Sequence, residues 1–94
     1  MNKRNYNALV TTFEGTVNYE LTFEHHPSVK EVLENLHTAV QKKNELAVPL
    51  LVNIRRDVHA SGQEQHLFNE STIFHCGRDG AWLRIYCPLY TDES

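Results

Sequence analysis

Apolar and polar residues alternate along the first quarter of the chain. Between residues 6 and 23, the large apolar side chains fall on every second position on both sides of a Glu-Gly pair at 14–15. This pattern predicts a hairpin with one apolar face, in which Tyr6 lies opposite Phe23. Glu-Gly is a weak turn signal, and a bulge at Gly15 would shift the register.

A helical period follows. Ser28 and Glu31 form a capping box, the pattern in which a serine side chain and a glutamate three residues later cap the start of a helix. Behind it, apolar residues recur at helical spacing: Val29, Val32, Leu33, Leu36, Ala39 and Val40. The pattern predicts one amphipathic helix over 28–43, with Asn44 ending it in a left-handed conformation.

Alternation returns after the helix. The apolar positions of this segment are Val48, Leu50, Val52, Ile54 and Val58. A period of two indicates a strand with one core face, so we expect a third strand over 48–59. Pro49 near its start indicates an edge position, because proline cannot donate a hydrogen bond to a neighbouring strand.

The last hairpin is predicted to consist of strands over 71–76 and 81–87, joined by the Asp-Gly pair at 79–80. On one face this register pairs Cys76 with Leu83, Phe74 with Ile85 and Thr72 with Cys87. The opposite face carries Ile73, His75, Trp82, Arg84 and Tyr86. The first of these faces has the composition of a core, and the second contains the residue types that contribute most to binding energy.

These elements together predict a single α+β domain over 1–94. Its order is ββαβββ: an antiparallel sheet of about five strands with one amphipathic helix packed on one face. One helix covers only one side of such a sheet. The other side is therefore expected to face solvent, a partner or a second copy of the chain.

Composition narrows the possible partners and compartments. The chain has 94 residues and a formal net charge of −3, so its overall field does not attract phosphate backbones. No stretch approaches the roughly 18 apolar residues of a membrane span. With two cysteines and no apolar run near the N-terminus, we expect a cytoplasmic protein that has no membrane partner.

Histidine and cysteine are the candidate metal ligands. They occur as the adjacent pairs His25-His26 and His75-Cys76, and Cys87 adds a second thiol. Adjacent residues on a strand point to opposite faces, and the chain has no CxxC or HxxxH spacing. We therefore expect no metal, no cofactor and no disulfide, with both cysteines acting as small apolar residues.

A small ribonuclease is one alternative function. It would use His59, His66 and His75 as acid and base, with Arg55 or Arg84 stabilising an anion. The chain has 12 acidic residues against 9 lysines and arginines, whereas such enzymes need a basic groove. No nucleophile, phosphate loop or carboxylate pair stands out, so we predict no enzyme activity and no catalytic residues.

A nucleic-acid-binding sheet is the other alternative. An open sheet face with aromatic and basic side chains can stack unpaired RNA bases. The residues available for this are Phe13, Arg55, His75, Trp82, Arg84 and Tyr86. The predicted strand order differs from that of the common RNA-recognition sheet, and the Gly-aromatic run of that motif is missing.

Protein binding is the function that the sequence favours. Trp, Tyr and Arg are enriched at interface hot spots, and here they share one face of one strand. We predict a non-catalytic intracellular module that inhibits or adapts a larger protein, with homodimerisation as a further option. Immunity proteins, antitoxins and phage or mobile-element anti-defence proteins are of this type. The predicted partner-binding residues are Trp82, Arg84, Tyr86, His75, Ile73, Phe13 and Leu9.

Overall fold

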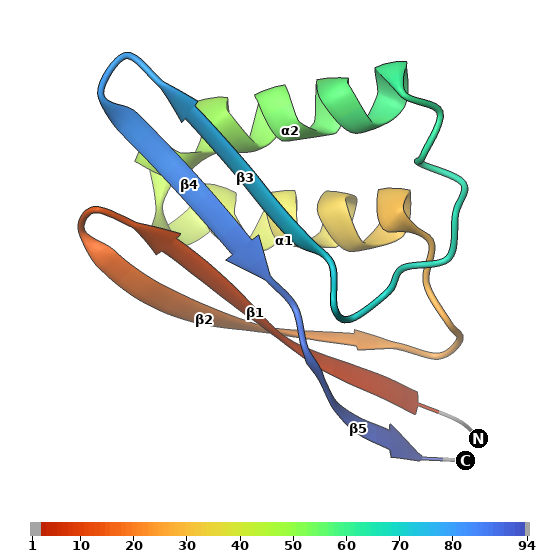
Figure 1. The fold of residues 1–94 in the computed structure, drawn as a ribbon. Coiled ribbons are helices and arrows are strands. Elements are labelled where there is room, and N and C mark those ends of the chain that lie inside the picture. Colours follow the sequence, from red (N-terminus) through yellow and green to blue (C-terminus); the bar gives the residue numbers. More distant parts are fainter. Residues whose placement is uncertain (1–2, 94) are drawn as a thin grey trace.

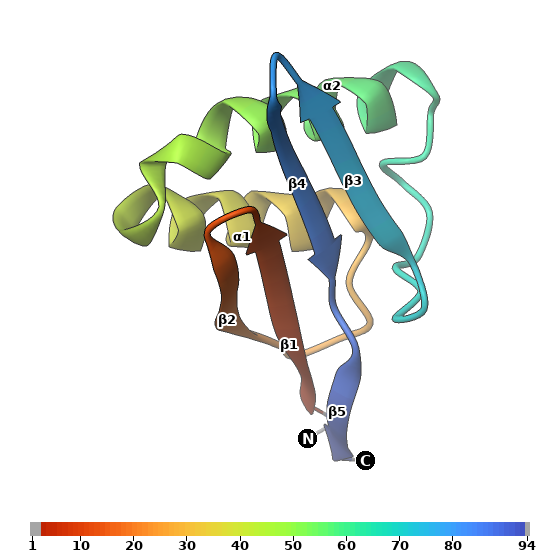
Figure 2. The same ribbon diagram turned by 60° about the vertical axis from the view of Figure 1, so that its left-hand side comes forward.

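The computed structural model describes residues 3–93 and shows an α+β fold (Figure 1). Its elements are β1 (Lys3–Thr12), β2 (Gly15–Phe23), α1 (Val29–Lys43), the short 3-10 helix η1 (Glu45–Ala47), α2 (Val48–Ala60), β3 (Ile73–Arg78), β4 (Ala81–Tyr86) and β5 (Leu89–Glu93). The five strands form one antiparallel sheet in the order β2-β1-β4-β3, and β5 also pairs with β1. Both α-helices lie on the same side of this sheet (Figure 2). The predicted class is confirmed, but the element order contains two α-helices where one was expected.

The β1–β2 hairpin has the predicted buried face and a different register. Tyr6 lies opposite Leu21, two residues from the predicted partner Phe23. The reason is the turn, which uses residues 13 and 14 and leaves Gly15, at φ +123°, as the first residue of β2. A shift by two residues keeps every side chain on its own face. The apolar face of the hairpin is therefore still buried against the helices.

Helix α1 begins as the sequence predicts. The Ser28 hydroxyl accepts a hydrogen bond from the Glu31 backbone N–H at 3.2 Å, and the Glu31 carboxylate accepts one from the Ser28 N–H at 3.0 Å. The helix ends at Lys43, and the Asn44 N–H still donates to the carbonyl of Val40 at 2.8 Å. Asn44 has φ −145°, so the predicted left-handed ending is wrong. The chain instead continues through η1 directly into α2.

The strand predicted over 48–59 is wrong, because this segment forms helix α2. Its buried residues are Leu50, Leu51, Ile54 and Val58, which recur at helical and not at alternating spacing. Leu51, which the strand reading placed on the polar side, is fully buried. Pro49 lies in the first turn, where its missing N–H removes no helical hydrogen bond.

The β3–β4 hairpin confirms the predicted register over most of its length. Phe74 pairs with Ile85, and Cys76 pairs with Leu83. Both turn residues, Asp79 at φ 50° and Gly80 at φ 82°, have the left-handed backbone that such a two-residue turn requires. The ladder runs over 73–78 and 81–86, so the predicted pair Thr72–Cys87 falls outside it.

Strand β5 and the burial of Phe68 in the segment 61–72 were not predicted. Strand β5 follows Pro88 and pairs with the first residues of β1, while β4 pairs with residues 9–11 of the same strand. In the segment 61–72, Phe68 is fully buried and its ring packs edge-on against Tyr6, with a centroid distance of 5.5 Å. Its N–H donates to the Pro27 carbonyl at 2.9 Å, which ties this segment to the start of α1.

Candidate interaction surface

Both helices cover one face of the sheet (Figure 1). Six of the seven predicted partner-binding residues lie on the opposite face, on β1, β4 and β3. One row consists of Asn18, Leu9, Tyr86 and Ile73, from β2, β1, β4 and β3 in turn. The next row consists of Thr16, Thr11, Arg84 and His75. Beyond it, Trp82 pairs with Gly77. We call this surface, on residues 9, 73, 75, 82, 84 and 86, the open sheet face.

The apolar side chains of the open sheet face are accessible to solvent. Trp82 is 42% exposed and Ile73 is 45% exposed, although both lie within strands. Leu9 and Tyr86 are half-buried, because strands on both sides flank them. A small domain that leaves a tryptophan and an isoleucine this exposed has apolar surface available for a partner.

Charge is distributed unevenly over the sheet. Arg84 and His75 are exposed neighbours, and the side chain of neither makes a hydrogen bond or ion pair with any residue among those described. Towards β2 the surface becomes polar and carries one exposed carboxylate, Glu20, opposite Asn7. Three side-chain hydrogen bonds join β1 and β2 there: Thr11 to Thr16, Asn18 to Asn7 and Thr22 to Asn5. The cationic and aromatic part therefore lies over β4 and β3.

Phe13 does not lie on the open sheet face. It occupies the tip of the β1–β2 turn and is 68% exposed. There it lines a cleft of about 210 Å³ with Trp82 and Leu46, at the end of the sheet. Sequence reasoning missed Leu46, which η1 leaves 73% exposed. The one sequence feature that points to Leu46 is that it is an apolar residue outside the helical pattern of α1.

The histidines of the ribonuclease alternative lie on both sides of the sheet. His75 is on the open sheet face, whereas His59 is on α2, where its ring contacts the Glu64 carboxylate at 2.6 Å. His66 is exposed in the segment that follows α2. Arg55 contacts the His37 ring at 2.8 Å between the two helices. This set of residues therefore does not converge on one site.

The remaining candidate metal ligands have structural partners. His26 contacts the Phe68 carbonyl at 2.8 Å, and His25 contacts the Glu31 carboxylate at 2.6 Å beside the capping box. Both cysteines are free thiols, and burial raises the pKa of Cys87 to about 12. Within residues 3–93, no three histidine, cysteine or acidic side chains come together in a way that would hold a metal ion.

Comparison with protein-family models, curated proteins and solved structures gave no match to this chain. Among residues 3–93, no helix has the length and apolar character needed to cross a membrane.

Proposed function

We propose that the chain is a non-catalytic intracellular module that binds a larger protein through the open sheet face and so inhibits or adapts it. The observation that carries this proposal is the placement of Trp82, Arg84 and Tyr86 on alternate residues of β4. Strand β4 lies between β1 and β3, so Arg84 and Tyr86 have a paired strand on either side, and Trp82 lies where this face meets the end of the sheet.

The surroundings of these residues support an interface. Leu9 and Ile73 extend the apolar area to the neighbouring strands on the same row as Tyr86. On the β2 side, hydrogen-bonded Asn and Thr side chains and the exposed carboxylate of Glu20 border the patch with polar groups. An aromatic and arginine-bearing centre with a polar rim is the usual anatomy of a protein interface.

A second copy of the chain is one partner that fits this proposal. Within residues 3–93, strand β3 is an edge strand that pairs only with β4, and it borders the open sheet face. Edge strands present unpaired backbone groups that can extend a sheet into another molecule. A dimer formed there would also stabilise a domain of this size.

Single-stranded RNA is the second candidate ligand. It is favoured by Arg84 and His75, which lie side by side without ionic partners among the described residues, between the aromatic rings of Trp82 and Tyr86. Aromatic rings on an open sheet stack bases, and arginine contacts phosphates. RNA binding of this kind weakens steeply as salt is added, whereas a largely apolar protein interface changes little. The chain's net charge of −3 favours the protein partner.

The test is affinity capture with three forms of the full chain. Wild type, Arg84→Glu and the control Lys30→Glu are each immobilised and incubated with a lysate of the source cells, with and without ribonuclease. Both substitutions reverse one exposed positive charge, but Lys30 lies on α1, on the opposite side of the sheet. We expect the same protein to be captured by wild type and Lys30→Glu and lost with Arg84→Glu. Equal capture by all three forms, or capture that ribonuclease removes, contradicts a protein partner at this face.

A further inference from the structure

Strand β3 lies at the margin of the sheet with one edge uncovered (Figure 2). Arg78 and Ala81 pair across a two-residue turn, so every second pair of the β3–β4 ladder, counted from them, is joined by backbone hydrogen bonds. The N–H and C=O groups of the residues between, Ile73, His75 and Gly77, therefore point away from β4. Among the described residues no strand pairs with β3 on that side, and all three residues are exposed.

The edge of β3 lacks the features that protect edge strands from pairing. Lysine, proline and bulges are the usual protection, and β3 has none of them. Its arginine, Arg78, is at the end next to the turn. The opposite edge of the sheet differs, because Lys42 and Lys43 of α1 lie beside residues 18–20 of β2. Strand addition is therefore expected at β3 and not at β2.

Gly77 leaves a gap on the open sheet face, next to Trp82, with which it pairs. The hairpin does not need glycine there. Gly77 has no left-handed backbone, and an added Cβ atom would lie 3.8 Å from the Ala81 carbonyl oxygen and 3.9 Å from the Trp82 Cβ atom, which are ordinary contacts. Glycine inside a strand often marks a place where another backbone approaches closely. A residue opposite Gly77 on an added strand would lie two strand spacings, or about 10 Å, from the Trp82 backbone, so a large side chain there can pack against the exposed indole ring.

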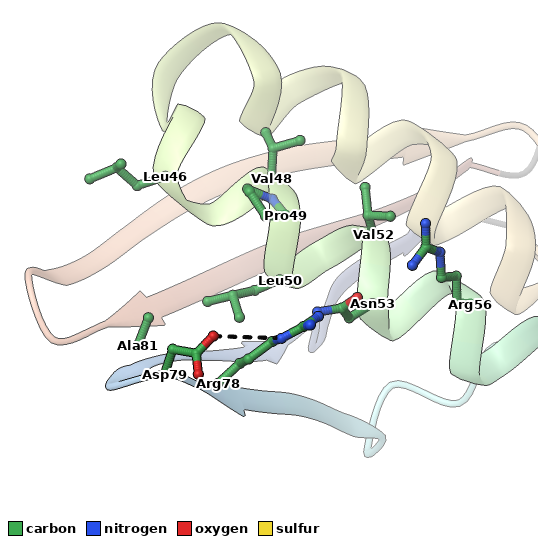
Figure 3. A pocket seen from close by; sticks show the side chains of 10 residues that line it. All are labelled: Leu46, Val48, Pro49, Leu50, Val52, Asn53, Arg56, Arg78, Asp79 and Ala81. Carbon is green, nitrogen blue, oxygen red and sulfur yellow. Dashed lines mark ion pairs between the residues drawn. The ribbon is translucent and has the colours of Figure 1, made fainter.

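Positive charge beside this gap is not balanced. Arg84 and His75 are paired across β4 and β3, and neither side chain has an ionic partner among the described residues. The other open-face positions of these two strands carry no carboxylate. Asp79 lies in the turn, where it faces Arg78 at 3.8 Å (Figure 3), and Glu70 precedes the strand. An acidic residue is therefore the favoured neighbour of His75 on an added strand.

The other side of β3 offers apolar contact. Phe74 and Cys76 pair with buried residues of β4 and pack against the core, but both are only half-buried. The helices therefore do not fully cover the outer margin of the sheet. Side chains on the second face of an added strand would cover these two residues.

We propose that β3 binds an extended strand of the partner protein, which adds to the sheet at this edge. On the open-face side, the strand carries a large apolar residue opposite Gly77 and an acidic residue opposite His75, two positions apart. Strand addition supplies backbone hydrogen bonds for affinity and side-chain contacts at alternate positions for specificity. This inference rests on the proposed function and specifies which part of the partner is bound.

A second copy of the chain satisfies only half of this requirement. Its own β3 can supply the backbone hydrogen bonds, but it has no carboxylate at positions 73, 75 and 77. Pairing of two copies would instead bring two His75 side chains and two Arg84 side chains to the same part of the sheet. Charge complementarity therefore selects a strand of a different protein.

Peptide selection identifies the strand. A phage-displayed library of short random peptides is panned against the immobilised full chain, and the enriched peptides are synthesised with a fluorescein label for polarisation measurements. We expect enrichment of a large apolar residue and an acidic residue that are separated by one position. Enrichment of peptides without acidic residues, or no enrichment, would overturn the inference.

Backbone methylation shows whether the selected peptide binds as a strand. Each of its residues is replaced in turn by the N-methyl form, which removes one N–H donor and keeps the side chain. Alternate residues of a strand direct their N–H groups to the same side. We therefore expect binding to weaken at least about tenfold at every second position and to change little at the positions between. Equal tolerance of methylation at all positions would contradict strand addition.

Two variants at one residue locate the edge on the protein. Ile73→Pro and Ile73→Thr both remove the apolar side chain, but only proline removes the N–H that points away from β4. Proline is tolerated at the first residue of a strand, and circular dichroism checks that each variant is folded. We expect Ile73→Pro to bind the peptide at least about tenfold more weakly than Ile73→Thr. Equal affinity of the two variants would contradict binding at β3.

The charge is tested with the variants of the capture experiment. Arg84→Glu is expected to weaken peptide binding, and Lys30→Glu on α1 is expected to leave it unchanged. Self-association of the chain that Ile73→Pro abolishes, together with no enriched peptide, would assign the edge to a second copy and overturn the inference.

Lysate capture separates this inference from the proposed function. Capture that is lost with Arg84→Glu but equal for Ile73→Pro and Ile73→Thr would overturn strand addition and leave the proposed function intact. Equal capture by wild type and Arg84→Glu counts against the proposed function, whereas the methylation pattern and the Ile73 variants test strand addition independently.

Discussion

Replacement of Leu51 by alanine tests whether residues 48–60 are a helix packed on the sheet. Leu51 is fully buried, while its neighbour Val52 is half-buried and lines a groove beside α2. An alternating strand places these two residues the other way round, with Val52 in the core. If the segment is a helix, Leu51→Ala lowers the unfolding free energy more than Val52→Ala does. If it is a strand, Val52→Ala lowers it more.

The size of the effect follows from burial. Leu51→Ala removes a buried side chain and leaves a cavity, which costs about 2–5 kcal/mol of unfolding free energy. Leucine and alanine both favour helices, so little of this cost comes from helix propensity. Because a small domain has a total stability of about 5–15 kcal/mol, this is a large fraction of it. For Val52→Ala we expect a change within about 1 kcal/mol, because its partial burial is offset by the better helix propensity of alanine.

Urea unfolding followed by circular dichroism gives both values. A loss of about 3 kcal/mol also corresponds to a fall in melting temperature of roughly 12–24 °C for a domain of this size. A larger loss of stability with Val52→Ala than with Leu51→Ala would contradict the helical arrangement of residues 48–60. A similar small loss for both would mean that α2 is not packed against the sheet.

Four further predictions concern individual side chains. Tyr19→Phe is expected to raise the unfolding free energy by about 1 kcal/mol, because the Tyr19 hydroxyl is buried and has no hydrogen-bond partner among the described residues. Urea unfolding measures this change, and a loss of stability would contradict the prediction. A thiol reagent at neutral pH is expected to label the half-buried Cys76 in the folded protein, and Cys87 only after unfolding. Burial raises the pKa of Cys87 from 9.0 to about 12. The contribution of the protonated thiol to stability is therefore complete below pH 9 and is lost as the pH rises towards 12. An unfolding free energy that stays constant over this pH range would contradict the prediction. Ser28→Ala is expected to lower the unfolding free energy by about 1 kcal/mol, because it removes the capping box with Glu31, whereas Ser28→Thr retains the cap. Thermal melts compare the two variants, and equal stability would mean that the cap does not contribute.

The elements that the sequence predicts well are those fixed by local chemistry. The Asp79-Gly80 turn accepts two left-handed residues, and this sets the register of β3 against β4. The capping box at Ser28 likewise fixes the start of α1 from neighbouring residues alone. In both cases the decisive interactions lie within a few positions along the chain.

Long-range packing decided the elements that the sequence did not reveal. Residues 48–58 satisfy both an alternating and a helical pattern, and only contact with the sheet shows that Leu51 is buried. Phe68 stands alone in a polar segment, yet it fills the core beside Tyr6. Its burial depends on hydrogen bonds to the region before α1, which no local pattern encodes.

The candidate surfaces divide in the same way. The open sheet face was predictable because alternation along β4 places Trp82, Arg84 and Tyr86 on one side. The groove between α2 and the β3–β4 hairpin was not, because it requires Arg56 on a helix and Arg78 on a hairpin to line a common space (Figure 3). Once residues 48–59 were assigned to a strand, this arrangement could not be inferred.

Native mass spectrometry of the chain recovered from its own source cells tests the central claim, that the open sheet face binds protein, most directly. Wild type and Arg84→Glu are recovered and measured in parallel. We predict that wild type appears as a dimer or with a stoichiometric protein partner, and that Arg84→Glu appears as a folded monomer. A wild-type chain that appears only as a bare monomer, or one that carries nucleotides and no protein, would contradict the claim.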